Sequence, residues 1–248
     1  MPAKQASATV DPAEVEKFDR LAATWWDPHG PMRPLHRLNP TRLAYLRDRL
    51  CAHFGRDPAA RRPLAGLGVL DVGCGGGLIA EPLARLGAKV IGIDAAAENI
   101  RVAQAHARES GLAIDYRVET AESLAARERQ FDAVLALEIV EHVADVPGFV
   151  TAAAALVAPR GAMVLSTLNR TPKAFLQAIV GAEYLLRWLP RGTHDWRRFQ
   201  KPAELARAVR AHGLAVRDTS GLTLDLRTGD WRLSDDPSVN YLLFATKA

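Results

Sequence analysis

Short apolar runs alternate with helix-length segments from residue 68 onward. Five such runs are separated by intervals long enough for a helix: 69–72, 89–94, 114–118, 131–137 and 161–167. Runs spaced in this way are typical of successive βαβ units, in which buried parallel strands are joined by helices. Two further runs, 214–220 and 241–246, follow a helical segment at 201–212, and we expect both to be strands. The pattern predicts an α/β fold.

Before residue 68, apolar residues recur at the spacing of a helix. Asp11 can cap a helix whose apolar face carries Val15, Phe18, Ala22 and Trp25. A proline-rich loop at 28–40, a second helix at about 41–54 and a polar linker at 55–66 follow. We therefore divide the chain into an N-terminal helical extension with its linker, 1–66, and a main domain, 67–248, with an inserted lid at about 170–200.

Composition narrows the function classes. The 248 residues are 48% hydrophobic and 24% charged, as in an ordinary globular protein. The net charge is +4, but only six of the 32 basic residues are lysine and the arginines are dispersed, which argues against a nucleic-acid surface. The chain shows no signal-peptide pattern at its start and no apolar stretch long enough to span a bilayer. Cys51 and Cys74 suggest no disulfide, so we expect a cytoplasmic protein.

A glycine-rich loop follows the first strand of the main domain. The string Asp71-Val-Gly-Cys-Gly-Gly-Gly77 leads directly into a helix expected near Leu78. Glycines there allow positive φ and let a ligand approach bare backbone at a helix N-terminus. Asp94 ends the second strand, 21 residues after Gly73, where an acid can accept hydrogen bonds from ribose hydroxyls. The alternative interpretation is that the glycines form only a tight turn between strand and helix and that Asp94 caps the next helix. No Gly-Lys-Ser/Thr follows the loop, which excludes a Walker-type phosphate loop. The sixth position of a dinucleotide motif Gly-x-Gly-x-x-Gly is not glycine here, which argues against a dinucleotide site.

Three chemically active residues follow the fourth strand. Glu138, Glu141 and His142 would share one face if this segment is helical or turn-like. Three interpretations remain open: a divalent-cation site, a metal-free site in which His142 is the general base, or acids that merely favour a helix N-terminus. His194 is a rival base.

Strings along nearly the whole chain resemble the ubiquinone-biosynthesis O-methyltransferase family, within the class I S-adenosylmethionine-dependent methyltransferases. Besides the glycine loop with Asp94, these are WWD (25–27), PLHRLNPTRL (34–43), EIVEH (138–142), STLNR (166–170), VGAEY (180–184), GTHD (192–195) and KPAE (201–204). The resemblance implies a Rossmann-like fold with a seven-stranded, mostly parallel sheet, helices on both faces and an antiparallel strand insertion at its end.

The resemblance also implies donor-binding positions. They fall on Arg42, Gly73, Asp94 and Leu137, with Asp71 and Gly75 in the same loop; Leu137 stands where family members can carry methionine. Arg42 would pair with the donor's carboxylate. Thr120 and Ala121, after the third strand, would lie at the adenine. The same resemblance implies Mg²⁺ at Glu138, Glu141 and His142.

The implied acceptors are polyprenylated phenols and quinols. The apolar segment 172–190 has basic flanks, so it can be a lid over the acceptor, a contact with an anionic membrane, or both. A location at the inner face of the membrane and contact with other ubiquinone-biosynthesis proteins follow as expectations. Another small catechol, a nucleic acid, or a non-catalytic membrane scaffold are the competing interpretations. The intact glycine loop argues against the scaffold.

Overall fold

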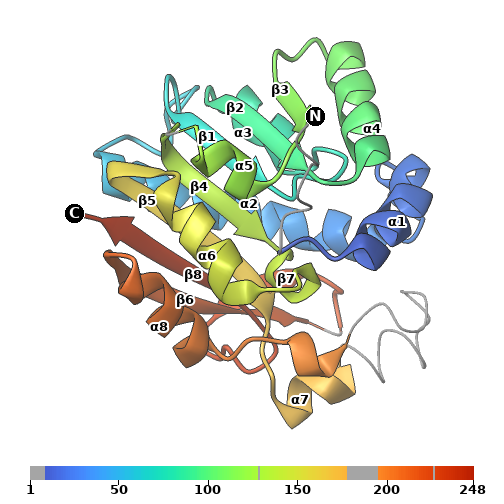
Figure 1. Ribbon diagram of the computed structural model, residues 1–248, viewed down its shortest axis with the longest axis vertical. Coiled ribbons are helices and arrows are strands. Elements are labelled where there is room, and N and C mark those ends of the chain that lie inside the picture. Colours follow the sequence, from blue (N-terminus) through green and yellow to red (C-terminus); the bar gives the residue numbers. More distant parts are fainter. Residues whose placement is uncertain (1–8, 128, 178–194, 226) are drawn as a thin grey trace, which may run out of the picture.

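The computed structural model describes residues 9–127, 129–177, 195–225 and 227–248. Its centre is an eight-stranded sheet of order β3-β2-β1-β4-β5-β8-β6-β7 (Figure 1). Five parallel strands carry the predicted apolar runs: β1 (Gly68–Val72), β2 (Lys89–Asp94), β3 (Asp115–Val118), β4 (Phe131–Leu137) and β5 (Val157–Leu168). The predicted α/β class is confirmed.

The remaining three strands are antiparallel: β6 (Leu214–Leu224), β7 (Trp231–Ser234) and β8 (Asn240–Lys247). β8 lies between β5 and β6, which is the antiparallel insertion that the resemblance implied. The predicted count of seven strands is wrong because β7 was missed. This edge strand has four residues and pairs on one side only, so its sequence carries little of the alternation that identifies a strand.

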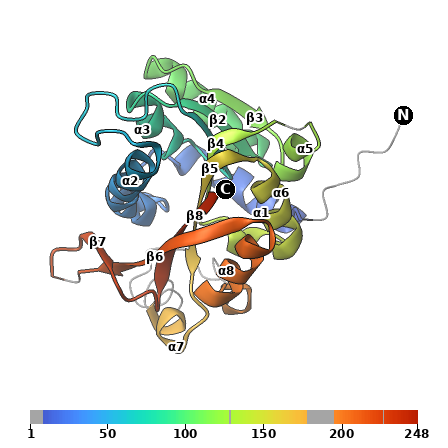
Figure 2. The ribbon, with the colours of Figure 1, turned by 90° about the vertical axis from the view of Figure 1, so that its left-hand side faces the viewer.

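Helices cover both faces of the sheet, as Figure 2 shows for α2 and α3 on one side and α5 and α6 on the other. One layer consists of α2 (Arg33–Phe54), α3 (Ala80–Arg85) and α4 (Ala97–Glu109). The opposite layer consists of α5 (Ala121–Ala125), α6 (Val146–Ala155) and α8 (Pro202–Ala211). The apolar faces of these helices bury the sheet, which is the usual arrangement for parallel strands.

The first helix, α1 (Pro12–Leu21), begins where the sequence predicts. The Asp11 side chain accepts a hydrogen bond from the Ala13 amide at 3.0 Å. A short 3₁₀ helix, η1 (Ala22–Thr24), follows, and Asp19 accepts a hydrogen bond from the Glu98 amide at the start of α4. The N-terminal segment is thus anchored to the main domain.

The second helix is longer than predicted. The proline-rich stretch at 28–40 was expected to be a loop, but α2 begins at Arg33 and includes Pro40. Pro40 removes one amide donor from the helix interior. Leu38 and Leu46, on either side of it, are buried in the core that α2 shares with β1, β4 and β5, and this packing outweighs the low helix propensity of proline. The division of the chain at residue 66 stays a prediction.

Three short helices complete the described chain: η2 (Val140–His142), α7 (Pro172–Ala174) and η4 (Trp196–Arg198). Of the predicted lid, the structure describes only the beginning and the end, and residues 178–194 lie outside the described part. Among the residues that the structure describes, no helix combines the length and apolar character that a membrane span requires.

Candidate active site

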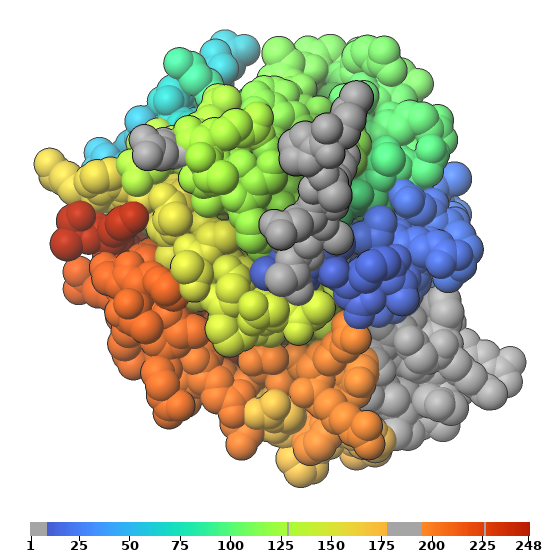
Figure 3. Space-filling view, in the orientation of Figure 1, coloured from blue at the N-terminus to red at the C-terminus, as the bar shows by residue number. Residues whose placement is uncertain are grey.

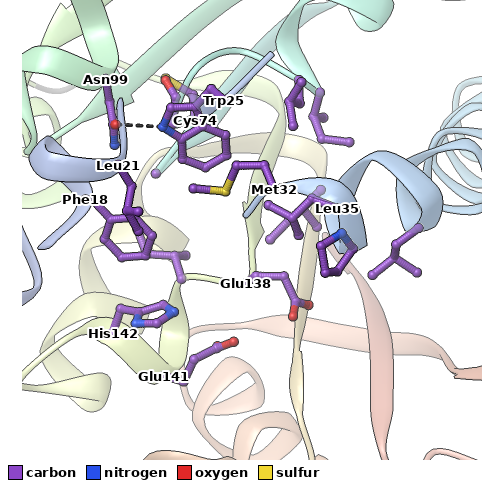
Figure 4. A pocket seen from close by; sticks show the side chains of 18 of the residues that line it. Phe18, Leu21, Trp25, Met32, Leu35, Cys74, Asn99, Glu138, Glu141 and His142 are labelled. Carbon is purple, nitrogen blue, oxygen red and sulfur yellow. Dashed lines mark hydrogen bonds between the residues drawn. The ribbon is translucent and has the colours of Figure 1, made fainter. Parts of the chain in front are cut away.

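A cavity of about 370 Å³ opens at the carboxyl ends of β1, β2 and β4 and is walled by α1 and α2 (Figure 4). Nine of the residues predicted to form the site line it: Arg42, Asp71, Gly73, Gly75, Asp94, Leu137, Glu138, Glu141 and His142. Thr120 and Ala121 do not. Thr120 caps α5 and Ala121 is buried in the core, so their place at an adenine stays a prediction without support from the cavity lining.

The glycine loop has the conformation that its sequence predicts. Gly73 and Gly75 have φ of +70° and +53°, which L side chains rarely adopt. A Cβ at Gly73 would also lie 2.1 Å from the side chain of Ile139. The Asp94 carboxylate accepts hydrogen bonds from the amides of Gly75 (2.9 Å) and Ala96 (2.8 Å), and its burial raises its pKa. Asp94 therefore holds the loop in place and retains lone pairs for a ligand.

Asp71 lies beneath the same loop. It is buried, and its Oδ2 atom has no hydrogen-bond partner among the described residues. Burial, reinforced by the negative charge of Asp94, raises the pKa of Asp71 to about 7. A cationic group entering the cavity here would stabilise the ionised carboxylate.

Two tryptophans of the N-terminal segment cover the glycine loop. Trp25 donates to Asn99 Oδ1 at 2.7 Å, and its indole lies where a Cβ on Gly75 would be only 2.4 Å away. Trp26 donates to the carbonyl of Gly76 at 2.9 Å. Neither tryptophan was predicted to lie at the glycine loop, although the WWD string was a signal for such a role. In the space-filling view, the blue N-terminal residues lie at the surface next to the green residues of α4 (Figure 3).

Arg42 and Glu138 form the buried ion pair of the site. Arg42 Nη2 lies 2.6 Å from Glu138 Oε1, and the arginine side chain is only 2% exposed. Glu138 also accepts hydrogen bonds from Ser166 Oγ (2.8 Å) and Asn240 Nδ2 (3.1 and 3.2 Å). Its φ of +52° turns the chain sharply at the end of β4. Residues of α2, β4, β5 and β8 therefore meet at one carboxylate.

Glu141 has a different environment. It is buried and accepts a hydrogen bond from Thr167 Oγ1 at 2.6 Å. Burial raises its pKa well above the usual value for a glutamic acid, and the charge of Glu138 adds to this shift. Burial therefore favours the protonated form of Glu141 relative to that of an exposed glutamic acid.

His142 pairs with a residue of α1 that was not among the predicted site residues. Its Nδ1 lies 2.8 Å from Oε2 of Glu14, which comes from α1. Phe18 contacts the imidazole edge-on, with ring centroids 5.1 Å apart. The hydrogen bond to His142, together with the positive charges of His142 and Lys17, lowers the pKa of Glu14 to about 2 against the penalty of burial. Glu14 is therefore ionised at neutral pH and orients the imidazole.

The three residues predicted to bind Mg²⁺ do not form a ligand set. Among the described residues, no three His, Cys, Asp or Glu side chains are arranged to hold a metal ion. Glu138 follows a sharp turn and faces Arg42, whereas Glu141 and His142 lie in η2 and face Thr167 and Glu14. A shared face was expected only if the segment is helical or turn-like, and Glu138 lies outside the helix with a positive φ. The rival base, His194, lies outside the described residues.

Residues 39–219 match the family model described as a methyltransferase domain. The ubiquinone biosynthesis O-methyltransferase of Methylobacterium sp. (strain 4-46) is 56% identical over 239 residues, which are 96% of each chain. The protein of the same name from Azorhizobium caulinodans is 55% identical over 243 residues, covering 98% of this chain and 96% of that one.

A solved structure supports the fold. Magnesium protoporphyrin IX methyltransferase from Synechocystis PCC 6803, crystallised with bound SAH, superposes with a TM-score of 0.65 at 21% identity. The superposition covers 94% of this chain and 95% of that one. The mixed sheet with helices on both faces is thus the Rossmann-like methyltransferase fold.

The first prediction concerns Asp94. Replacing Asp94 by Ala removes the hydrogen bonds from the amides of Gly75 in the loop and Ala96 at the start of α4, and with them the acceptor for a ribose. We expect the dissociation constant of S-adenosylhomocysteine, measured by calorimetry, to rise more than about tenfold, because hydrogen bonds to charged groups contribute about 1.5–3 kcal/mol each. The matched control is Asp115→Asn on β3, outside the cavity. Unchanged affinity in Asp94→Ala would remove Asp94 from the donor site.

The second prediction concerns the buried ion pair. Glu138→Gln leaves the guanidinium of Arg42 opposite a neutral amide, so the free energy of unfolding in urea should fall by about 3–5 kcal/mol. Glu98→Gln breaks the exposed pair with Arg101 and should cost no more than about 1 kcal/mol. Equal losses in the two variants would contradict a desolvated pair at Arg42.

Proposed function

The chain belongs to the ubiquinone biosynthesis O-methyltransferase family, and we propose that it transfers the methyl group of S-adenosylmethionine to phenolic hydroxyls of polyprenylated ubiquinone precursors. The two reactions convert a 2-polyprenyl-6-hydroxyphenol to its 6-methoxy product and a 3-demethylubiquinol to the ubiquinol. Besides the family, the observation that carries the proposal is the Glu14–His142 pair, which puts an oriented base in the same cavity as the glycine loop.

Groups in the cavity fit the polar parts of the donor. Asp71 Oδ2 and Arg42 Nε are buried and lack hydrogen-bond partners among the described residues. A carboxylate suits the donor's ammonium and a guanidinium suits its carboxylate, while Asp94 can accept from the ribose hydroxyls. Leu137 offers an apolar contact nearby. When bound, S-adenosylmethionine supplies a methyl group on a positively charged sulfur.

His142 removes the proton from the phenolic hydroxyl. Because ionised Glu14 accepts the hydrogen on Nδ1, the lone pair of the neutral imidazole is on Nε2. The phenolic oxygen becomes a good nucleophile as its proton moves to Nε2, and the resulting imidazolium is stabilised by Glu14. The histidine thus needs no metal to act as a base, and the arrangement of Glu138, Glu141 and His142 supports no step through Mg²⁺.

Apolar side chains enclose the place where the phenol ring would lie. Phe18, Met32 and Leu35 border the space between the glycine loop and the glutamates (Figure 4). Such a wall excludes water from the phenolate and strengthens its interaction with charged groups. The acceptor class itself comes from the family.

A polyprenylated acceptor resides in a membrane, so we extend the proposal to peripheral contact with an anionic bilayer at its cytoplasmic face. Phe175 and Leu176, at the start of the insertion, are 44% and 60% exposed. Some of the flanking basic residues predicted to face the lipid are already paired, as in Arg170 with Glu204 and Lys173 with Asp236. The exposed Phe175 and Leu176 therefore support membrane contact more strongly than the basic residues do. Contact with other ubiquinone-biosynthesis proteins also stays a proposal.

The third prediction tests the reaction. Labelled S-adenosylmethionine is incubated with the protein and a catechol carrying a short prenyl chain, with added Mg²⁺ and again after thorough chelation. We expect label in the methyl ether and none in an RNA control. Failure to methylate the catechol despite measurable donor binding would exclude this acceptor class. Transfer that requires Mg²⁺ would contradict the metal-free assignment and indicate that Glu138, Glu141 and His142 rearrange.

The fourth prediction concerns Glu14. His142→Ala should lower kcat about 10²–10⁴-fold. Glu14→Gln should lower kcat by a smaller factor without changing the dissociation constant of S-adenosylhomocysteine, because the amide holds the ring but stabilises its positive form less. Glu16→Gln, on the exposed face of α1, is the matched control. A kcat of Glu14→Gln equal to that of Glu16→Gln would contradict the positioning role.

Glu14→Gln should also change how the stability of the protein depends on pH. Since the pKa of Glu14 falls from an ordinary 4.5 to about 2 on folding, its ionised form stabilises the native state fully above pH 4.5. This stabilisation is lost as the pH falls toward 2. In urea unfolding, the stability difference between the unsubstituted protein and Glu14→Gln should therefore narrow below pH 4.5. A constant difference would show that Glu14 acts without its charge.

A further inference from the structure

The cavity changes character beyond the reaction centre. Its donor end is polar, with Asp71, Asp94 and Asn99 in the lining. Past Glu138 the lining continues onto Leu222 and Leu224 of β6 and Trp231 of β7. A single cavity thus runs from charged groups suited to the donor to an apolar wall on the far side of the glutamates.

The β6–β7 hairpin presents one apolar face to this space. In the strand register Leu224 pairs with Trp231 and Leu222 pairs with Leu233. Side chains on paired strands alternate between the two faces, so these four share one face, while Thr223 and its partner Arg232 lie on the other.

The hairpin is held in place against α2. The hydroxyl of Thr41 donates to the carbonyl of Trp231 at 2.7 Å, and the guanidinium of Arg37 packs directly over Gly229 in the turn. The backbone of Trp231 is therefore anchored at the cavity wall, and its side chain packs against the core that α2 shares with the sheet. The loop after β7 is tied to the start of α7, where Asn169 donates to the carbonyl of Pro237 at 2.9 Å.

Exposed apolar side chains lie on the hairpin and at the start of the insertion. Leu233, beside Leu222, is 43% exposed, and Leu176 is 60% exposed. Gln177, the residue after Leu176, lines the cavity. A chain of apolar groups leaving the reaction centre along the hairpin would lie against the apolar face that these residues share.

A second apolar part of the cavity, around Phe18 and Trp25, is already committed to the proposed chemistry. Phe18 contacts the ring of His142, and Trp25 lies on the glycine loop. A ligand group there would lie between the base and the methyl donor, which is where the phenol ring must be for transfer. The tail must leave in another direction.

From these contacts we propose that Leu222, Leu224 and Trp231 form a subsite for the first isoprene unit of the acceptor's polyprenyl tail. The proposal rests on the proposed function, since it takes the prenylated phenol as the acceptor. The subsite fixes which way the phenol enters: the ring at His142 and the tail along the β6–β7 hairpin. It also gives these three residues a role in selecting prenylated over simple catechols.

The test compares two acceptors, a catechol bearing a farnesyl chain and the same catechol without it. Trp231→Ala, and independently the milder Leu224→Ala, should raise KM for the farnesyl compound about tenfold or more. Both should leave kcat and KM for the simple catechol unchanged. Arg232→Ala, an exposed position on the other face of the same strand, is the matched control. A KM that rises equally for both acceptors, or for neither, would overturn the subsite.

A binding measurement separates this proposal from the proposed function. Equilibrium dialysis of the farnesyl catechol with the intact protein, in the presence of S-adenosylhomocysteine, needs no turnover. Weaker binding by Trp231→Ala and Leu224→Ala, but not by Arg232→Ala, would support the subsite even if neither catechol is methylated. Equal binding by all four proteins would overturn it whether or not the reaction occurs.

Discussion

The guanidinium of Arg42 is a positive charge almost without access to water, and the site is organised around its neutralisation. A buried charge is tolerated only with a partner and further hydrogen bonds. Glu138 is that partner, and Ser166 and Asn240 hold its carboxylate. This requirement brings α2, the end of β4, β5 and β8 to one point and explains why a residue other than glycine adopts a positive φ after β4.

The N-terminal helices are part of the site. Glu14 and Phe18 of α1 orient His142, and Trp25 covers the glycine loop through which the donor would be bound. His142 follows β4, whereas the carboxylate that pairs with it comes from α1. In the proposed mechanism the N-terminal segment therefore supplies both the carboxylate that orients the base and the indole that covers the glycine loop.

Site features formed by residues close together in the sequence were predictable, whereas contacts between residues far apart in the sequence were not. The glycine loop and Asp94 belong to one βα unit, so their spacing in the sequence fixes their spacing in space. Glu14 and His142 are 128 residues apart, and only the packing of α1 brings them together. Pro40 misled the helix prediction because burial overrode its propensity, and Trp231 was missed because its edge strand is short. The apolar runs of the parallel strands gave the fold class because full burial leaves a clear pattern.

The positions of the tryptophans allow binding in the cavity to be followed by intrinsic fluorescence. Of its five tryptophans, Trp25 is hydrogen-bonded to Asn99 at the donor end of the cavity and Trp231 lies at the opposite, apolar end. Trp26 is stacked on His106, with ring centroids 3.4 Å apart. Indole emission depends on the polarity around the ring, so single-tryptophan versions would signal occupancy of each end separately. The order in which the two ligands bind can then be followed by stopped-flow fluorescence with unlabelled compounds.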